Sequence, residues 1–318
     1  MTRNVRLLVA VLTVLLHATV AVAADRYFVL ITGASGGATY AQKYDTWRTS
    51  LVATLKQTLA YPDDHLFVLA EAESRSAANA TRENVRRVLG DLGKRLGNDD
   101  LSFVLLIGHG TSADDEGKFN LVGPDLSSSE WAALVKPMAG RLVFINMTGG
   151  SFAFMRKLAA PGRIVITATD SSAQQFETVF PEFFVKALSD AAADVDKNGR
   201  VSVWEAFSYA SAAVRQWFDQ HGQLPTERPL LDDNGDGIGQ EALNPGPDGV
   251  IARATYFAPE PMASADSVLA KRRADLERQL DELRLRKASS KDPARYDAEI
   301  EQLLVEIARL SQQIRSPR

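Results

Sequence analysis

The sequence predicts an α/β fold with a doubly wound, mainly parallel sheet flanked by helices. Short apolar runs occur that are continuous rather than alternating, which is typical of parallel strands buried on both faces. Segments with helical periodicity separate the first three runs, and this alternation implies right-handed crossover connections. At 318 residues, with 45% hydrophobic and 24% charged residues, the chain is long enough to bury such a core.

The predicted strands follow one another along the first half of the chain. They are residues 27–31, 66–69, 103–107, 142–145 and 164–167. The predicted helices are residues 40–59, 81–96, 181–193 and 203–218. In the first of these helices Trp47, Leu51 and Leu55 share one face, as a helix covering a sheet requires. In sheets of this kind the functional groups lie beyond the carboxyl ends of the strands.

The N-terminus has the pattern of an export signal. Arg3 and Arg6 precede an apolar run over residues 7–16, and small residues at 21–23 form a cleavage site. We therefore expect a signal peptide over residues 1–23 and an exported, periplasmic protein that has no membrane contact after cleavage; an uncleaved anchor is the alternative. The chain has no cysteine, so its core must be stable without disulfides. A net charge of −4 with interspersed signs argues against a nucleic-acid partner.

The composition divides the remaining chain into two parts. Residues 24–260 are assigned to the α/β domain, and residues 261–318 carry apolar residues at alternating spacings of three and four. This heptad pattern predicts an antiparallel helical hairpin, a short coiled coil with a polar turn. Arg273 and Lys287 fall at seam positions, which leaves docking on another surface or dimerisation open. The hairpin is therefore a candidate surface for a protein partner or for self-association.

Residues 194–205 fit the calcium-binding loop of an EF-hand at every ligand position. Asp194, Asp196 and Asn198 supply side-chain oxygens at positions one, three and five, and Gly199 allows the sharp turn. The remaining ligands are the Arg200 carbonyl, Ser202 and the bidentate Glu205. Calcium needs six to eight hard oxygens, so the loop predicts a bound Ca²⁺ with a structural role. The alternative is an acidic turn between two helices.

An Asp/Gly-rich loop over residues 231–249 begins a similar pattern. Asp232, Asn234 and Asp236 follow the same spacing, but Leu243 stands at the twelfth position and Glu241 comes two residues early. A second ion held with help from Asp248 and a turn rich in Asx and Gly are both open.

Two strand ends carry the residues that suggest chemistry. The strand at 103–107 runs into Gly108-His109-Gly110, and the strand at 142–145 runs into Asn146-Met147-Thr148-Gly149-Gly150-Ser151. This pair of motifs, in this order, resembles the legumain and caspase-like cysteine peptidases. The strand at 163–169 and the helix start at 177–180 also resemble exported bacterial members of the legumain type. The resemblance covers roughly residues 25–218 and implies a caspase-like fold.

The resemblance implies that His109 occupies the place of the family's general base and Thr148 that of its cysteine nucleophile. Without a cysteine the thiolate chemistry of the family is excluded. An internal threonine lacks the N-terminal amine that activates working threonine nucleophiles. We therefore expect an inactive homologue that binds or scaffolds, holding a peptide or protein in the cleft above the sheet. The alternatives are a residual hydrolase using Thr148 or Ser151 with His109, and a plain calcium-stabilised structural module.

Two further segments near these strand ends have a structural interpretation. Asp114, Asp115 and Glu116 follow His109 and can orient its ring, but an acidic surface loop is the commoner explanation. The glycine-rich residues 33–37 are interpreted as a tight strand–helix turn rather than a phosphate cradle, because the lysine of a P-loop is missing.

Overall fold

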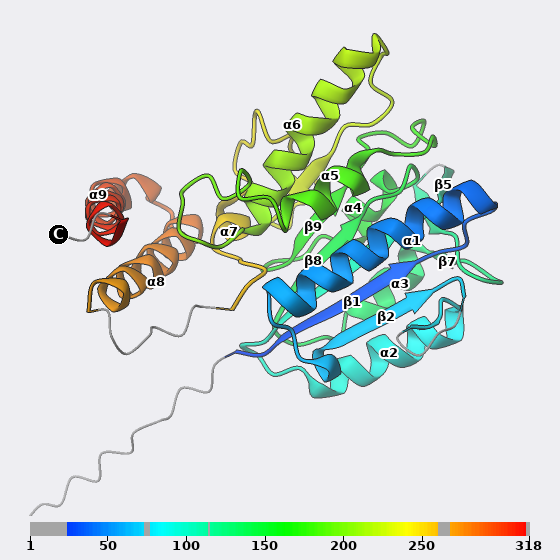
Figure 1. Cartoon of the computed structure of the whole chain (residues 1–318), viewed down its shortest axis with the longest axis horizontal. Coiled ribbons are helices and arrows are strands. Elements are labelled where there is room, and N and C mark those ends of the chain that lie inside the picture. The colour runs from blue at the N-terminus through cyan, green and yellow to red at the C-terminus, as the bar shows by residue number, and fades with distance from the viewer. Residues whose placement is uncertain (1–23, 73–76, 114, 260–267, 316–318) are drawn as a thin grey trace, which may run out of the picture.

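A computed structural model describes residues 24–72, 77–113, 115–259 and 268–315. The proposed signal peptide at 1–23 lies outside these residues. A seven-stranded sheet with the order β10-β9-β8-β4-β1-β2-β3 crosses the molecule (Figure 1), and all its strand pairs are parallel except β10 with β9. The predicted fold class, a mainly parallel sheet flanked by helices, is confirmed.

All five predicted strands are present: the first four are longer by one or two residues, and the fifth has the predicted bounds. In chain order the sheet strands are β1 Arg26–Thr32, β2 Leu66–Ala70, β3 Ala78–Asn79, β4 Leu101–Ile107, β8 Arg141–Asn146, β9 Ile164–Thr167 and β10 Leu230–Asp232. Every residue of β4 is buried, as expected for a central strand covered on both faces. The sequence analysis did not predict β3 or β10. Strand β10 also takes the first two residues of the predicted loop at 231–249.

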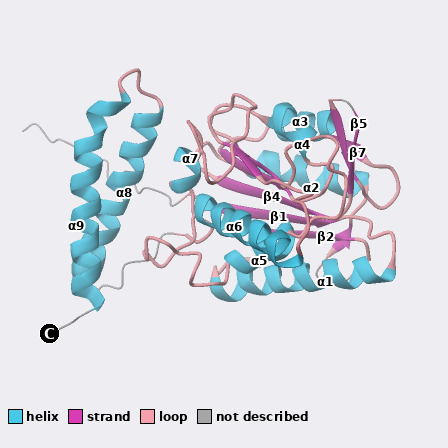
Figure 2. Cartoon of the chain, turned by 90° about the horizontal axis from the view of Figure 1, so that it is seen from above, coloured by secondary structure: helices cyan, strands magenta, loops and turns pink. Residues whose placement is uncertain are grey.

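Helices cover both faces of the sheet (Figure 2). One face carries α1 Ala38–Ala53, α5 Phe180–Ala187 and α6 Val203–His221, and the other carries α2 Arg82–Arg95, α3 Ser128–Val135 and α4 Phe152–Leu158. Alternate residues of β1 serve the two layers: Phe28 and Leu30 pack toward α1, and Val29 packs toward α2. The first predicted helix ends in a π-helical turn, Thr54–Thr58. The third prediction, 181–193, was too long: α5 stops at Ala187, and turns lead from there into the acidic loop.

A small antiparallel sheet follows β4 and was not predicted. It consists of β5 Gly110–Ala113, β6 Glu116–Phe119 and β7 Leu126–Ser127, in that order. These strands are short, and only alternate residues of β5 are buried, so they lack the continuous apolar run that marks the central strands. The sheet starts directly after His109 and therefore flanks the carboxyl end of β4.

The C-terminal segment forms the predicted helical hairpin. Helix α8 Val268–Ala288 and helix α9 Asp297–Arg315 are joined by a turn containing the 3-10 helix Pro293–Tyr296. Leu276, Leu280 and Leu283 of α8 are buried. The hairpin lies at the opposite end of the sheet from β5 and β7, beside the short helix α7 Val250–Arg253 (Figure 2). Among the described helices, none combines the length and apolarity that a bilayer-spanning segment needs.

Arg273 explains why a charged residue is tolerated near the seam. Its guanidinium donates a hydrogen bond to the main-chain carbonyl of Asn198 at 2.9 Å and pairs with Glu277 at 3.3 Å. The hairpin is therefore docked on the acidic loop at 194–205, one of the arrangements that the sequence left open.

Candidate functional site

The two predicted motifs meet at one edge of the sheet. Strands β4 and β8 are parallel neighbours, with Leu105 opposite Ile145 and Leu106 opposite Asn146. His109 follows β4 by two residues, and Thr148 follows β8 by two residues. Both therefore lie beyond the carboxyl ends of adjacent strands, where α/β proteins place their functional groups.

The ring of His109 is held by the turn after β1. Its Nε2 lies 3.0 Å from the carbonyl oxygen of Ser35, and since a carbonyl only accepts, Nε2 donates. In the neutral ring this contact fixes the tautomer and leaves Nδ1 as the acceptor. The edges of Tyr40 and Tyr44, one helical turn apart on α1, pack on the half-buried ring at centroid distances of 4.6 and 5.6 Å.

Of the acidic residues after His109, Asp115 and Glu116 contact groups other than the imidazole. The carboxylate of Asp115 faces Arg156 at 3.9 Å. The carboxylate of Glu116 accepts hydrogen bonds from Ser128 and Ser129 at the start of α3, at 2.7 to 2.9 Å. Asp114 lies outside the described residues. The imidazole is therefore oriented by a backbone carbonyl, an interaction that no side-chain motif could have indicated.

Thr148 is fully buried and bound to its own strand. Its N–H and its hydroxyl both donate to Oδ1 of Asn146, at 3.1 and 2.9 Å. A Cβ placed on Gly110 would lie 2.4 Å from the threonine Oγ1. The second glycine of the Gly-His-Gly motif is therefore required because the Thr148 side chain lies directly against its backbone.

Ser151 has a structural role. Its hydroxyl shares a hydrogen bond with the hydroxyl of Thr169 at 3.0 Å and accepts the N–H of Ala168 at 3.0 Å. It is also fully buried, and it ties the start of α4 to the end of β9. Within the described part of the chain, no hydrogen bond joins the His109 ring to either hydroxyl.

The segment between β9 and α5 covers the strand ends. Thr178 donates to the carbonyl of Met147 at 2.5 Å, and Gln175 donates to the carbonyl of Ser112 at 2.7 Å. A Cβ on Gly149 would lie 2.2 Å from the carbonyl oxygen of Phe176. This close backbone contact encloses Thr148 and separates it from solvent.

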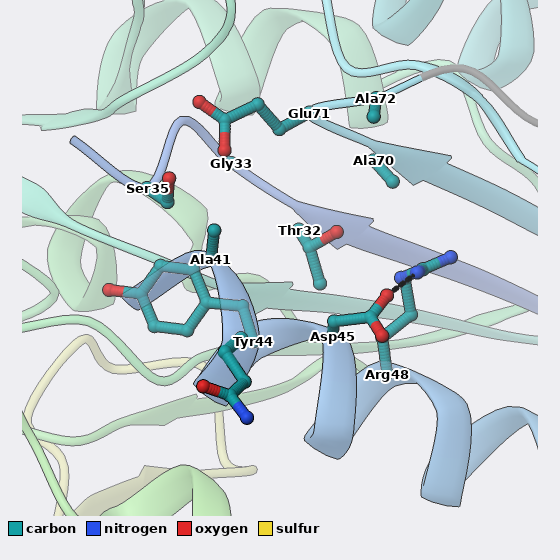
Figure 3. Close-up of a pocket in the computed structure, with 11 residues that line it drawn as sticks. Thr32, Gly33, Ser35, Ala41, Tyr44, Asp45, Arg48, Ala70, Glu71 and Ala72 are labelled. Atoms are coloured by element: carbon teal, nitrogen blue, oxygen red, sulfur yellow. Dashed lines mark hydrogen bonds and ion pairs between the residues drawn. The ribbon is translucent and has the colours of Figure 1, made fainter. Parts of the chain in front are cut away.

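A cavity of about 340 Å³ lies at the carboxyl ends of β1 and β2, against α1 (Figure 3). Its wall includes Ser35 and Tyr44, both of which contact the His109 ring. Asp45 and Arg48 of α1 form an ion pair in the wall, and Glu71 after β2 lines the opposite side. The cavity is therefore lined by both signs of charge, and it shares Ser35 and Tyr44 with the surroundings of the imidazole. Sequence reasoning did not identify it, although Tyr40 and Tyr44 at a helical spacing near a strand end were visible.

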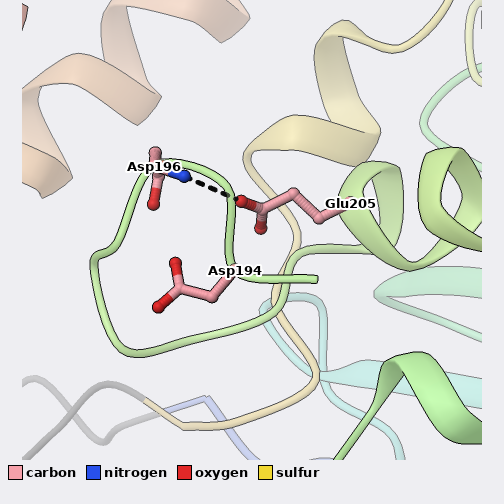
Figure 4. Close-up of side chains that lie close together, drawn as sticks. All are labelled: Asp194, Asp196 and Glu205. Atoms are coloured by element: carbon pink, nitrogen blue, oxygen red, sulfur yellow. Dashed lines mark hydrogen bonds between the residues drawn. The ribbon is translucent and has the colours of Figure 1, made fainter. Parts of the chain in front are cut away.

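The acidic loop at 194–205 brings three carboxylates together (Figure 4). Oxygens of Asp194, Asp196 and Glu205 lie within 4.8 Å of one another. Lys197 and Gly199 have left-handed φ values of 60° and 85°, which turn the loop around this point. Burial and the neighbouring Glu205 raise the pKa of Asp196 to about 7. Such crowding of like charges is the environment that a divalent cation relieves.

The other predicted ligands lie in the same loop. Asn198 is buried and accepts the N–H of Arg200 at 2.8 Å. Ser202 caps α6. Its hydroxyl accepts the N–H of Glu205 at 3.2 Å and donates to the side-chain carboxylate of Glu205 at 2.8 Å. Six hard oxygen ligands are thus available, a donor set that fits calcium.

Comparison with known proteins gives likenesses of fold. No protein-family model and no curated protein sequence matches the chain. A solved structure, protein GSU0716 from Geobacter sulfurreducens, is 16% identical with a TM-score of 0.41, and the match covers 65% of this chain and 92% of that one. The caspase drICE is 11% identical with a TM-score of 0.38, over 66% of this chain and 87% of its own.

A third similar structure is a secreted C11 cysteine protease from Bacteroides thetaiotaomicron in complex with an irreversible peptide inhibitor. It is 10% identical with a TM-score of 0.38, and the match covers 65% of each chain. These likenesses concern the chain trace and assign neither activity nor substrate to this protein.

Proposed function

We propose that this chain is an exported, catalytically inactive homologue of the caspase-like peptidases, with a legumain-type ancestry, that serves as a calcium-stabilised binding or scaffolding protein. One observation carries the proposal. Thr148 stands where the related peptidases have their nucleophile, and its hydroxyl is buried and donates to Asn146. The sequence contains no cysteine that could replace it.

The chemistry of this position argues against turnover. A general base must lie within about 2.6–3.2 Å of the proton that it removes. The Thr148 proton is directed to Asn146, and Nε2 of His109 carries its own proton toward Ser35. The competing hydrolase hypothesis rests on Nδ1 of His109, the acceptor nitrogen. It requires Thr148 or Ser151 to leave its present partner and the covering segment to move.

The cavity beside His109 supports the binding role. It lies at the carboxyl edge of β1, and its wall combines the Asp45–Arg48 pair with Tyr44. A polar side chain of an extended peptide suits such a cavity, since paired charges and an aromatic edge orient a ligand without reacting with it.

A calcium ion in the loop at 194–205 would stabilise the opposite end of the molecule. The ligand Glu205 lies in the first turn of α6, and the carbonyl of Asn198 is bound by Arg273 of the hairpin. Calcium would supply only charge neutralisation and ordering here. Its removal is therefore expected to loosen both the start of α6 and the docking of α8.

Turnover separates the two hypotheses. The purified protein, incubated with a broad peptide library, should give no cleavage beyond that of a His109→Ala control. Cleavage that is present in the unmodified protein and absent in His109→Ala would establish the hydrolase.

Partner capture tests the scaffolding role. Affinity capture from periplasmic extract should recover a protein that is lost when Ser264–Arg318 is deleted. Recovery of every partner by the truncated protein would remove the hairpin from the proposal. Fractionation of cells expressing the full chain tests the proposed export, which predicts periplasmic protein beginning near Ala24.

A further inference from the structure

A second acidic loop lies between β10 and α7. Numbered like an EF-hand loop from Asp232, it has Asn234 at position three, Asp236 at position five and Gly237 at position six. The sequence left open whether this segment binds an ion or is only a turn. Its geometry can be compared position by position with the loop at 194–205.

The two loops share their backbone conformation. Position four is left-handed in both, with φ values of 60° at Lys197 and 82° at Gly235. Position six is left-handed in both, at 85° and 76°. In both loops the N–H of position five donates to the side chain of position three, at 3.0 and 2.8 Å. The N–H of position seven donates to position five, at 2.8 and 2.7 Å, and that of position six to position one, at 2.9 and 2.7 Å.

Asp248 takes the place of the closing glutamate. In the first loop, Oε1 of Glu205 accepts the N–H groups of positions two and three at 2.9 and 3.4 Å. In the second loop, Oδ1 of Asp248 accepts the N–H groups of positions two and three at 3.1 and 3.3 Å. Asp248 therefore supplies from sixteen residues after Asp232 the carboxylate that Leu243 at position twelve does not provide.

The second oxygen of Asp248 is evidence for a ligand that does not depend on the similarity between the two loops. Asp248 is only 2% exposed, and its Oδ2 is buried without a hydrogen-bond partner among the described residues. A buried carboxylate oxygen without a donor is costly, so such atoms are normally satisfied by protein, water or a cation. The neighbouring Asp233 lies toward the start of α7 instead, where its two oxygens accept the N–H groups of Gly249 at 2.9 Å and Ala252 at 2.8 Å.

We propose that this loop is a second calcium site, formed by Asp232, Asn234, Asp236, the main-chain carbonyl of Ile238 and Asp248. These are all hard oxygens, and a bidentate Asp248 with one water completes the six to eight ligands that calcium takes. Among the described residues only the first loop brings three carboxylates within 4.8 Å of one another. At least one pair of carboxylates in the second loop is therefore farther apart than 4.8 Å, and two oxygens on opposite sides of a calcium ion, each 2.3–2.6 Å from it, are about 4.6–5.2 Å apart.

Titration calorimetry with Ca²⁺ on the full chain tests the site. Glu205→Gln removes the first loop's closing ligand, and in that background one ion should still bind. Adding Asp248→Asn, which keeps the Oδ1 acceptor, should raise the dissociation constant at least tenfold. Asp236→Asn in the same background should do likewise, and because this side chain is exposed it provides the readout if Asp248→Asn does not fold. Glu241→Gln, a nearby carboxylate outside the ligand set, is the matched control.

The outcomes separate this site from the proposed first one. Two ions bound by the unmodified protein, one by Glu205→Gln and none by the double variants support the proposal. A single ion that Glu205→Gln abolishes overturns it and leaves the first site intact. A single ion that survives Glu205→Gln and is lost with Asp248→Asn establishes the second site and rejects the first. Binding that survives both Asp248→Asn and Asp236→Asn overturns the second site.

Discussion

If the loop at 194–205 binds calcium as proposed, removal of the ion should lower the free energy of unfolding by an amount that follows from the dissociation constant. Exported calcium modules bind with dissociation constants of about 10⁻⁴–10⁻³ M. At about 10 mM free Ca²⁺ one such site contributes about 1.4–2.7 kcal/mol, from RT ln(1 + [L]/Kd). For a domain of this size the corresponding shift in Tm is roughly 3 to 10 °C. The assay is thermal unfolding in calcium and in chelator, and the readout is the difference between the two Tm values.

Glu205→Gln isolates the contribution of the first loop. Glu205 also accepts the N–H of Ser202 at 2.9 Å and that of Val195 at 2.9 Å, so the substitution removes an acceptor even without calcium. That loss, about 0.5–1.5 kcal/mol, lowers both Tm values equally. The difference between the Tm in calcium and the Tm in chelator should shrink by the contribution of one calcium site. Glu241→Gln should leave this difference unchanged. Equal melting of the unmodified protein in calcium and chelator, or an undiminished difference in Glu205→Gln, would refute the reasoning.

Two further predictions concern packing and pH. Gly110→Ala should destabilise the protein by about 1–3 kcal/mol in urea unfolding, because the new Cβ would meet Thr148 Oγ1 at 2.4 Å. The control Gly90→Ala, on the open face of α2, should be neutral or stabilising. Equal effects of the two substitutions would contradict the packing around Thr148. Burial raises the pKa of Glu227, whose carboxylate accepts the N–H groups of Val179 and Phe180, from 4.5 to about 7. The folded state therefore binds this proton more tightly than the unfolded chain, so its contribution to stability is complete below about pH 4.5 and is lost as pH rises through about 7. Glu227→Gln should flatten the plot of unfolding free energy against pH in this range. An unchanged slope in the variant would show that Glu227 is not the titrating group.

The central sheet was predictable because strands that are buried on both faces have continuous runs of apolar residues. All seven residues of β4 are buried, and six of them are apolar. The strands β5 and β6 left no such signal, since four-residue strands with alternating burial look like loops. Helix α3 is a different case. Its capping box, Ser127 with Glu130, was present in the sequence, but the apolar run after it is short.

The site was predictable in its position but not in its contacts. Strand order brought His109 and Thr148 to one edge, as the motifs indicated. The partner of the imidazole is the carbonyl of Ser35, which any residue type could provide. The burial of Thr148 depends on backbone approaches at Gly110 and Gly149, which involve segments far apart in the chain. The acidic loop was easier because its predicted ligands fall within twelve residues of the chain, at a spacing that local geometry fixes.

The hairpin lies at one end of the sheet (Figure 2), and the cavity is lined at the other end by residues that follow β1 and β2. A strand of seven residues such as β4 spans about 23 Å at roughly 3.3 Å per residue. If partners bind at both ends as proposed, they would not collide, and the protein could hold both at the same time. Its rigid core would then act as a fixed spacer, raising the effective concentration of one bound molecule near the other without any contact between them.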